Sequence, residues 1–202
     1  MNNQILHLPL FPIPTFLLPG GVTRLRIFEQ RYLKMVTIAA KGQGFVLMIS
    51  SKSAEHHEEK SEVKNRVNDN KWGSWVEVVN FHQGKDGVLE IDVKCSAMVK
   101  ILSLSQDKDE LRFGDVELLS HWSEHAIESN TSELYQSLKK LICEDKMLNT
   151  LYAMPTENSA NWVVARWLEL LPIALNLKTR FIEQHSFEEA KNLVHSIIFS
   201  EK

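Results

Sequence analysis

The fold is decided near the start of the chain by the segment LPLFPIPTFLLPGGVTRLRIFEQRY, which runs from Leu8 to Tyr32. Three prolines fall within Phe11–Pro19 and exclude a helix there, because proline lacks a backbone N–H and restricts the residue before it. The pair that follows predicts a tight turn, in which Gly20 or Gly21 supplies the positive φ. We therefore expect an extended segment with a sharp reversal.

Beyond the turn, the spacing of apolar residues changes from that of a strand to that of a helix. Val22–Ile27 alternates apolar and polar residues, as a half-buried strand does. In Phe28–Lys41 the apolar residues fall on one helical face. We expect Phe28, Tyr32 and Met35 to anchor this helix to the sheet.

Short strands are predicted for the remainder of the first half. They are Ile5–Leu10, Phe45–Ile49, Gly73–Phe81, Val88–Ser96, Met98–Leu104 and Leu111–Leu119. His82–Gly87 predicts a hairpin connection, since Asp86-Gly87 favours a tight reversal. The polar stretch Ser51–Asn70 predicts a long mobile loop. Short strands in sequence favour a small barrel or a curled sheet.

Helical patterns follow in the second half. They are Ser132–Cys143, Asn161–Leu170, Pro172–Gln184 and a last helix that opens near Ser186. Asn161–Leu170 is apolar nearly all round, which predicts a central buried helix with Trp162 and Trp167 in the core. The expected fold class is α+β, with a β-rich lobe over residues 1–119, a polar linker over 120–130 and a helical lobe over 131–202.

Composition restricts the class of protein. The 202 residues are 44% hydrophobic and 24% charged, and their formal net charge of −3 argues against broad nucleic-acid binding through phosphates. No apolar run approaches the roughly 20 residues of a membrane-spanning helix, and the first residues do not resemble a secretory signal. Cys95 and Cys143 form no CxxC motif and are expected to be reduced thiols on buried faces. We therefore expect a cytoplasmic protein.

A few polar and aromatic residues suggest chemistry of their own. His56–Glu59 and the pair His121 and His125 carry metal-ligating side chains, but neither group brings enough ligands together, so no metal or other cofactor is expected. Trp72 and Trp122 have polar neighbours, and we expect them to be partly exposed, where aromatic side chains often anchor peptide partners. Ordinary packing at the edge of the sheet is the alternative for both tryptophans.

The opening segment also carries three linked motifs. Leu8–Pro14 reads LPLFPIP, Leu18–Gly21 reads LPGG, and Leu25–Tyr32 reads LRIFEQRY. In order and spacing they closely resemble the signature of the Lon protease N-terminal domain, which reads LPLFPLP, a PG turn and LxIFExRY. The resemblance implies a PUA-like β lobe followed by a helical bundle, here as a stand-alone, bacterial-type copy. The chain departs from the family pattern at Cys95 and Met98, where a glycine and an arginine are common.

The motif residues are expected to serve the fold rather than catalysis. They are Pro12, Pro19, Gly20, Phe28, Glu29, Arg31 and Tyr32. Glu29 is expected at the start of a helix, where its charge complements the exposed N–H groups. Arg31 is expected to pair with a carboxylate or with the carbonyls that end another element. The motifs hold no nucleophile beside a base, so no catalytic residue is assigned.

The resemblance implies a non-catalytic module that binds unfolded or exposed hydrophobic polypeptide segments, in protein quality control or regulated proteolysis, with a protease or an ATPase as a further partner. The chain has no GxxxxGK[ST] phosphate loop, so ATP hydrolysis is not expected. We expect an apolar groove between the lobes, gated by Ser51–Asn70, and main-chain pairing at free strand edges. An RNA-binding PUA-like module is the alternative, and a small-molecule or metal-dependent enzyme is a weaker one.

Overall fold

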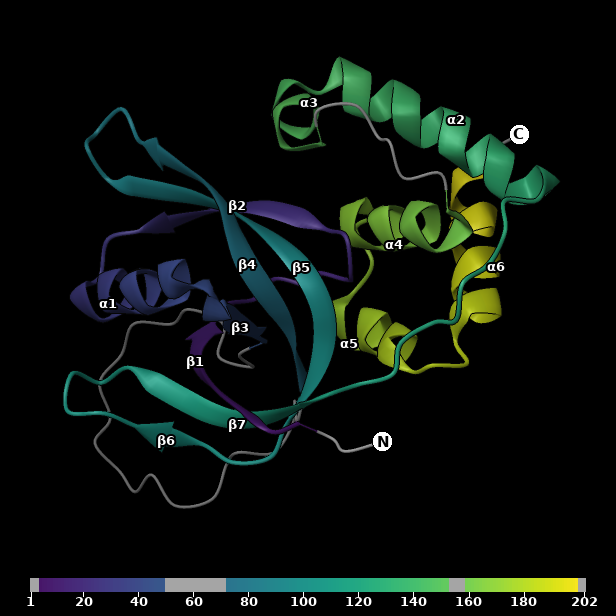
Figure 1. Cartoon of the computed structure of the whole chain (residues 1–202). Helices are drawn as coiled ribbons and strands as arrows, with labels where there is room; N and C mark the ends of the chain where they lie inside the picture. The colour runs from purple at the N-terminus through teal and green to yellow at the C-terminus, as the bar shows by residue number, and fades with distance from the viewer. Residues whose placement is uncertain (1–3, 50–71, 153–158, 200–202) are drawn as a thin grey trace.

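The computed structural model describes residues 4–49, 72–152 and 159–199, which form a β lobe and a helical lobe (Figure 1). The β lobe, up to residue 119, contains β1 (Leu6–Pro12), β2 (Val22–Ile27), α1 (Gln30–Ile38), a π-helical turn (Ala39–Gln43), β3 (Phe45–Met48), β4 (Trp72–Gln83), β5 (Leu89–Ile101), β6 (Ser105–Gln106) and β7 (Arg112–Leu118). The helical lobe, from residue 120, contains α2 (Ser129–Glu144), α3 (Lys146–Tyr152), α4 (Ala160–Leu170), α5 (Leu175–Lys178), a 3-10 turn (Thr179–Ile182) and α6 (Phe187–Phe199). The predicted loop at Ser51–Asn70 and the candidate metal ligands His56–Glu59 lie outside the described residues.

The strands form one sheet that closes on itself. Its seven strands follow the order β2-β5-β4-β3-β1-β7-β6, and an additional pairing of β5 with β7 closes the ring. Neighbouring strands are antiparallel except β1 and β3, which are parallel. The closed ring confirms the prediction of a small barrel, and the α+β class is confirmed with it. In the described residues, no helix is long and apolar enough to cross a bilayer.

The long strand β5 differs from the prediction. Val88–Ser96 and Met98–Leu104 were expected to be two strands, but Leu89–Ile101 forms a single strand of 13 residues. The β4–β5 ladder instead shifts register between Trp75 and Val76, where Ser96 has no partner across the ladder. Such bulges bend a strand and increase its twist. One continuous strand can therefore pair with β2 at its start and with β7 at its end.

Both faces of β3 are covered, which explains why this strand is apolar throughout. Neighbouring residues of a strand point to opposite faces. Val46 accordingly packs in a smaller cluster with residues of β1, β5 and β7, while Phe45 and Leu47 pack in the main core. All three side chains are buried. The main core continues from the sheet into the helical lobe.

The helix α1 begins later than the periodicity predicted. Its first residue is Gln30, with Glu29 as the N-cap residue, so Phe28 lies before the helix and is 72% exposed. The prediction that Phe28 anchors the helix is therefore wrong. Tyr32 and Met35 are buried, as predicted, and the Tyr32 ring packs edge-on against Phe11 with centroids 4.5 Å apart.

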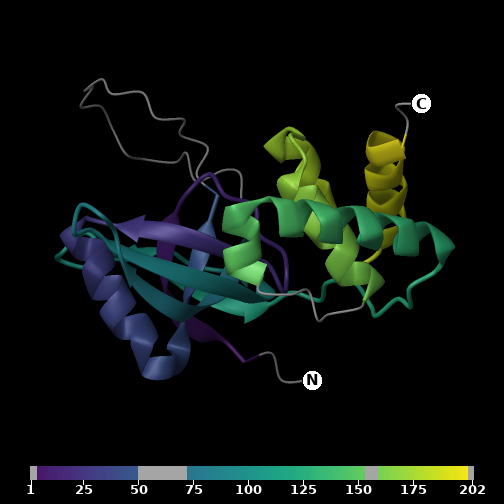
Figure 2. The same ribbon diagram turned by 90° about the horizontal axis from the view of Figure 1, so that it is seen from above.

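The helical lobe is built around α4. Trp162 and Trp167 on this helix are 5% and 7% exposed, which confirms the predicted central buried helix. The predicted helix Pro172–Gln184 is reduced to α5 and a 3-10 turn. The chain leaves α4 in an extended conformation at Leu171, the residue before a proline. In Figure 2, α2 and α4–α6 lie on one side of the β lobe and α1 lies on the other.

Candidate binding site between the lobes

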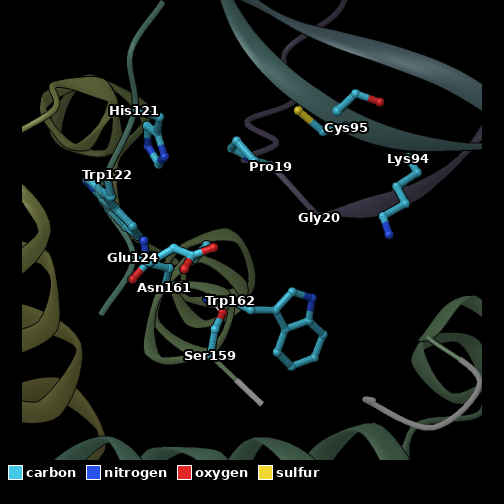
Figure 3. A pocket seen from close by; sticks show the side chains of 12 residues that line it. Pro19, Gly20, Lys94, Cys95, His121, Trp122, Glu124, Ser159, Asn161 and Trp162 are labelled. Carbon is cyan, nitrogen blue, oxygen red and sulfur yellow. Dashed lines mark hydrogen bonds between the residues drawn. The ribbon is translucent and has the colours of Figure 1, made fainter. Parts of the chain in front are cut away.

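A cavity of about 550 Å³ lies between the two lobes (Figure 3). It is lined by Pro19, Gly20, Lys94, Cys95 and Ser96 of the β lobe and by His121, Trp122, Glu124, Ser159, Asn161, Trp162 and Ala165 of the helical lobe. The expected groove between the lobes therefore exists. Its lining is a mixture of aromatic, charged and hydroxyl groups, so the prediction that it is apolar is wrong.

The Pro-Gly turn forms one wall of this pocket. Gly20 has a φ of 82°, which confirms that a glycine supplies the positive φ of the turn. Its N–H donates to the carbonyl of Cys95 over 2.8 Å. Gly21 is needed for another reason, because a Cβ atom added to it would lie 2.6 Å from Glu169 Oε1. The turn is therefore pressed closely against α4.

Two charged residues of α4 hold the turn, and we call Arg166 and Glu169 the α4 clasp. Arg166 Nη2 lies 2.7 Å from Glu169 Oε1, and its Nε lies 2.8 Å from Oε2. Glu169 Oε1 also accepts the N–H of Leu18 over 2.6 Å. Arg166 Nη2 donates to the carbonyls of Leu18 and Pro19 over 3.1 and 3.2 Å. The clasp thus bonds the main chain of the β lobe to a helix of the other lobe.

The clasp is deeply buried. The side chains of Arg166 and Glu169 are 0% and 8% exposed. Burial opposes the charge of Arg166, but the adjacent Glu169 carboxylate outweighs it and raises the pKa of the guanidinium. Arg166 Nη1 is buried with no hydrogen-bond partner among the described residues. A buried charge of this kind is costly unless it is paired, so the pair must act as a unit.

Of the two tryptophans singled out as peptide-binding candidates, only Trp122 lines the pocket. The prediction that Trp122 is partly exposed is wrong, since it is 8% exposed and its Nε1 donates to Ser186 Oγ over 2.9 Å. The segment before α2 is therefore packed against the start of α6. Trp72 is half-buried and meets the Phe16 ring edge-on, with centroids 6.2 Å apart.

The two histidines near Trp122 point to different partners. The ring of His121 stacks on Trp122 with centroids 4.5 Å apart, and its Nε2 donates to the carbonyl of Phe181 over 3.2 Å. Burial lowers the pKa of His121 to about 4, so the ring is neutral at pH 7 and its Nδ1 can accept a hydrogen bond. His125 instead pairs with Asn161. Among the described residues, no group of three or more His, Cys, Asp or Glu is arranged to hold a metal ion.

Most residues of the family motifs lie away from the pocket. Pro12 ends β1. Arg31 pairs with the carboxylate of Glu29 over 2.7 Å, which confirms the prediction that Arg31 pairs with a carboxylate. The Arg31 guanidinium also lies over the Tyr32 ring, 4.8 Å from its centroid. These contacts fit a structural role around α1. Pro19 and Gly20 differ from the other motif residues, because they line the pocket.

The two positions that depart from the family pattern are both buried. Cys95 is 1% exposed and Met98 is 0% exposed. Burial raises the pKa of the Cys95 thiol, whose Sγ lies 3.5 Å from the carbonyl of Ala97. Cys143 is exposed, so the prediction that both cysteines are buried is wrong for this residue. It follows Ile142, which faces the core, and therefore points about 100° away around α2.

The α4 clasp was not predicted from the sequence. Arg166 and Glu169 are the two charged residues of the nearly apolar stretch Asn161–Leu170, and neither was assigned a role. The available signal was their spacing, since opposite charges three residues apart on a helix can pair. In a helix with no polar face, such a pair has to be buried.

Comparisons with known proteins agree with this fold. The structure is similar to a Lon N-terminal domain protein from Xanthomonas campestris, with a TM-score of 0.66 and 22% identity over 94% of this chain and 97% of that one. It is also similar to the N-terminal domain of the Lon protease of Mycobacterium avium complex, with a TM-score of 0.60 and 11% identity over 96% and 98% of the two chains. No curated protein matches the sequence. The family model of the ATP-dependent protease La (LON) substrate-binding domain matches residues 7–198, and the chain therefore belongs to this family.

Proposed function

We propose that this protein recognises polypeptide segments and holds them in the pocket between its lobes, without catalysing a reaction itself. Membership of a family of substrate-binding domains supports the proposal. The observation that carries it is the pocket, whose walls come from both lobes and from the Pro-Gly turn of the family motif. Its volume of about 550 Å³ falls in the range of sites that enclose a small ligand or a few side chains.

The pocket offers groups that suit a polypeptide. The rings of Trp122 and Trp162 provide apolar surface for side chains. His121 Nδ1 and the carboxylate of Glu124 can accept hydrogen bonds from N–H groups. The hydroxyl of Ser159 already accepts the N–H of Trp162, and its proton remains available for donation. A segment with mixed side chains can therefore satisfy both its apolar and its polar groups.

The pocket is poorly suited to nucleophilic catalysis. Cys95 is the strongest nucleophile type in its lining, but the thiol is buried and its pKa is raised, whereas catalysis requires the thiolate. His121 uses its Nε2 on the carbonyl of Phe181. We infer that any proteolysis or ATP hydrolysis linked to this protein is supplied by a protease or an ATPase partner.

A blocked pocket tests the proposal. The probe is reduced, carboxymethylated α-lactalbumin, which stays unfolded, and binding is measured by fluorescence anisotropy. Ser96 lines the pocket and is exposed, so Ser96→Trp should fill the space and weaken binding at least ten-fold. Ser105→Trp on β6, at an exposed position away from the pocket, is the matched control and should bind as wild type does. Equal affinity of the two variants, or no binding by wild type, would contradict the proposal.

The RNA-binding alternative predicts a different result. RNA binding through phosphates weakens steeply as salt rises, because counterions are released. The charged side chains in the pocket lining are Lys94 and Glu124, which have opposite signs. We therefore expect no salt-dependent affinity for single-stranded RNA in the same assay.

A further inference from the structure

The outer edge of β2 carries main-chain groups that face away from the sheet. β2 is the terminal strand and, in the described residues, pairs with β5 alone. In an antiparallel pair, residues whose N–H and C=O face the neighbouring strand alternate with residues whose groups face away. The N–H of Cys95 donates to the carbonyl of Gly21, so Val22 is the next residue and faces away. By the same alternation, the main-chain groups of Arg24 and Arg26 also face away from β5.

Tyr152 occupies the first position of this edge. The N–H of Val22 donates to Tyr152 Oη over 3.1 Å, and the hydroxyl lies 3.4 Å from the carbonyl of Val22, to which it can donate. One hydroxyl thus takes the place of the carbonyl and the N–H that another strand would offer. In the part of the chain that the structure describes, nothing bonds the main-chain groups of Arg24 and Arg26. Among the described residues, the edge is therefore closed at Val22 and open at Arg24 and Arg26.

The open edge adjoins the pocket between the lobes. Tyr152 packs edge-on against Trp162, with centroids 5.8 Å apart, and Trp162 lines the pocket. Lys94, another lining residue, lies opposite Val22 in the β2–β5 ladder. A polypeptide held in the pocket can therefore continue past Tyr152 along β2.

The charges on β2 favour an extended polypeptide over a second copy of this chain. Arg24 pairs with Asp92, and Arg26 pairs with Asp86 and Glu90, so neither arginine presents an uncompensated charge to a neutral segment. Two copies joined antiparallel around Arg24 would instead place their arginines opposite one another. Because each arginine is already paired with a carboxylate of its own chain, it would gain no carboxylate partner from the other copy, so the edge offers no charge complementarity to a second copy.

We propose that β2 accepts an extended polypeptide segment as an additional strand, bonded to the main-chain groups of Arg24 and Arg26, and that a longer segment displaces the Tyr152 hydroxyl from Val22. This inference rests on the proposed function, because it concerns the same polypeptide. Main-chain pairing gives affinity that depends little on sequence, while the pocket selects side chains. The edge and the pocket together would hold a segment at two places.

Two variants of one residue test the main-chain contact. Arg26→Pro and Arg26→Ala both remove the guanidinium, but only the proline removes the N–H that faces away from β5. Proline is tolerated on an edge strand when its missing N–H faces solvent, and the ladder to β5 keeps its bonds. Arg26→Pro should bind reduced, carboxymethylated α-lactalbumin about ten-fold more weakly than Arg26→Ala. Equal affinities in two folded variants would overturn the inference.

Tyr152→Phe is the second variant and predicts the opposite change. It removes the hydroxyl that covers Val22 and keeps the ring against Trp162, so binding should become about two- to five-fold tighter. Hydrogen exchange should show new protection of the Arg24 and Arg26 amides when the unfolded protein is added. Absence of this protection, weaker binding by Tyr152→Phe, or a dimer that forms through β2 in light scattering would each overturn the inference.

The outcomes separate the two proposals. If Ser96→Trp abolishes binding and Arg26→Pro binds as Arg26→Ala does, the pocket function stands and strand addition is overturned. If wild type does not bind the unfolded protein, both fail. If Arg26→Pro alone weakens binding and Ser96→Trp does not, the edge is the site and the pocket function fails.

Discussion

Two arginines of this protein make similar ion pairs in different surroundings. Arg166 in α4 lies 2.7 Å from Glu169 and is 0% exposed, whereas Arg24 in β2 lies 2.6 Å from Asp92 and is 22% exposed. Arg166 also bonds the carbonyl of Leu18, 148 residues away in the sequence. The partners of Arg24 lie on neighbouring strands of one sheet. The first arginine thus connects the two lobes, and the second connects strands within one lobe.

The difference between the two pairs is decided by the groups that lose a partner when the arginine is removed. Without Arg166, a buried carboxylate loses its counter-charge and a buried carbonyl loses its donor. Without Arg24, the carboxylate of Asp92 is buried as well, at 4% exposed, but it keeps the ring of His82, whose Nε2 lies 2.6 Å from Oδ2. A buried charge that is left without a counter-charge is costly, whereas a buried charge that keeps another partner loses less. The predictions that follow test this ranking.

The largest effect is expected for Arg166→Met. The substitution leaves Glu169 buried without its counter-charge, which typically costs about 3–5 kcal/mol. For a chain of this length, such a loss lowers Tm by roughly 10 °C or more. Urea unfolding followed by circular dichroism gives the free energy directly.

The double variant Arg166→Met with Glu169→Met identifies the source of the loss. Removing both charges ends the charge imbalance, but the N–H of Leu18 still loses its acceptor and the carbonyls of Leu18 and Pro19 lose their donor. We expect the double variant to be more stable than Arg166→Met and still about 1–3 kcal/mol below wild type. Wild-type stability in the double variant would show that the bonds to the turn contribute nothing.

Acid should weaken the packing of His121 against Phe181 and Trp122 in the helical lobe before it affects the sheet. The pKa of His121 is lowered from 6.5 to about 4 by burial, so the unfolded chain binds a proton at higher pH than the folded chain does. The stabilising contribution of the neutral ring is therefore complete above pH 6.5 and is lost as pH falls toward 4. The expected loss is on the order of 1–2 kcal/mol.

Asp92 behaves in the opposite sense and at lower pH. Burial works to raise the pKa of this carboxyl, but hydrogen bonds from Arg24 and His82 outweigh burial and lower it. Its contribution is present above the ordinary carboxyl pKa of about 3.9 and is lost only below it. Urea unfolding should therefore show that the free energy of unfolding decreases between pH 7 and pH 4. In His121→Gln this decrease should be absent. The exposed His185→Gln is the control, and the same flattening in that variant would contradict the assignment to His121.

The β lobe was the more predictable part of the fold because its signals are local. The alternation in Val22–Ile27 gave the bounds of β2, and Asp86-Gly87 gave the hairpin, where Gly87 has a φ of 81°. The turn at Gly20 was also predicted. By contrast, the single strand β5 depends on register shifts in its ladder with β4, a strand from another part of the sequence. No pattern within Val88–Leu104 specifies them.

The candidate site was less predictable, because its contacts join residues far apart in the sequence. Trp122 has polar neighbours in the chain, and only the fold brings Ser186 and Phe187 over its ring. Arg166 and Glu169 were visible as charges, but their partners at Leu18 and Pro19 were not. Local polarity therefore gave the wrong exposure for Trp122 and no function for the clasp.

The smallest effect is expected for Arg24→Ala. Asp92 is 4% exposed but retains His82, so the loss should be roughly 1 kcal/mol, several times less than for Arg166→Met. Arg180→Ala is the control, since Arg180 and Glu189 are 61% and 54% exposed, and it should leave the free energy of unfolding nearly unchanged. Urea unfolding at pH 7 ranks the three variants. If Arg24→Ala lowers the free energy of unfolding as much as Arg166→Met does, the burial of the arginine does not explain the difference between the two pairs. The arginine on the sheet would then be as hard to replace as the one between the lobes.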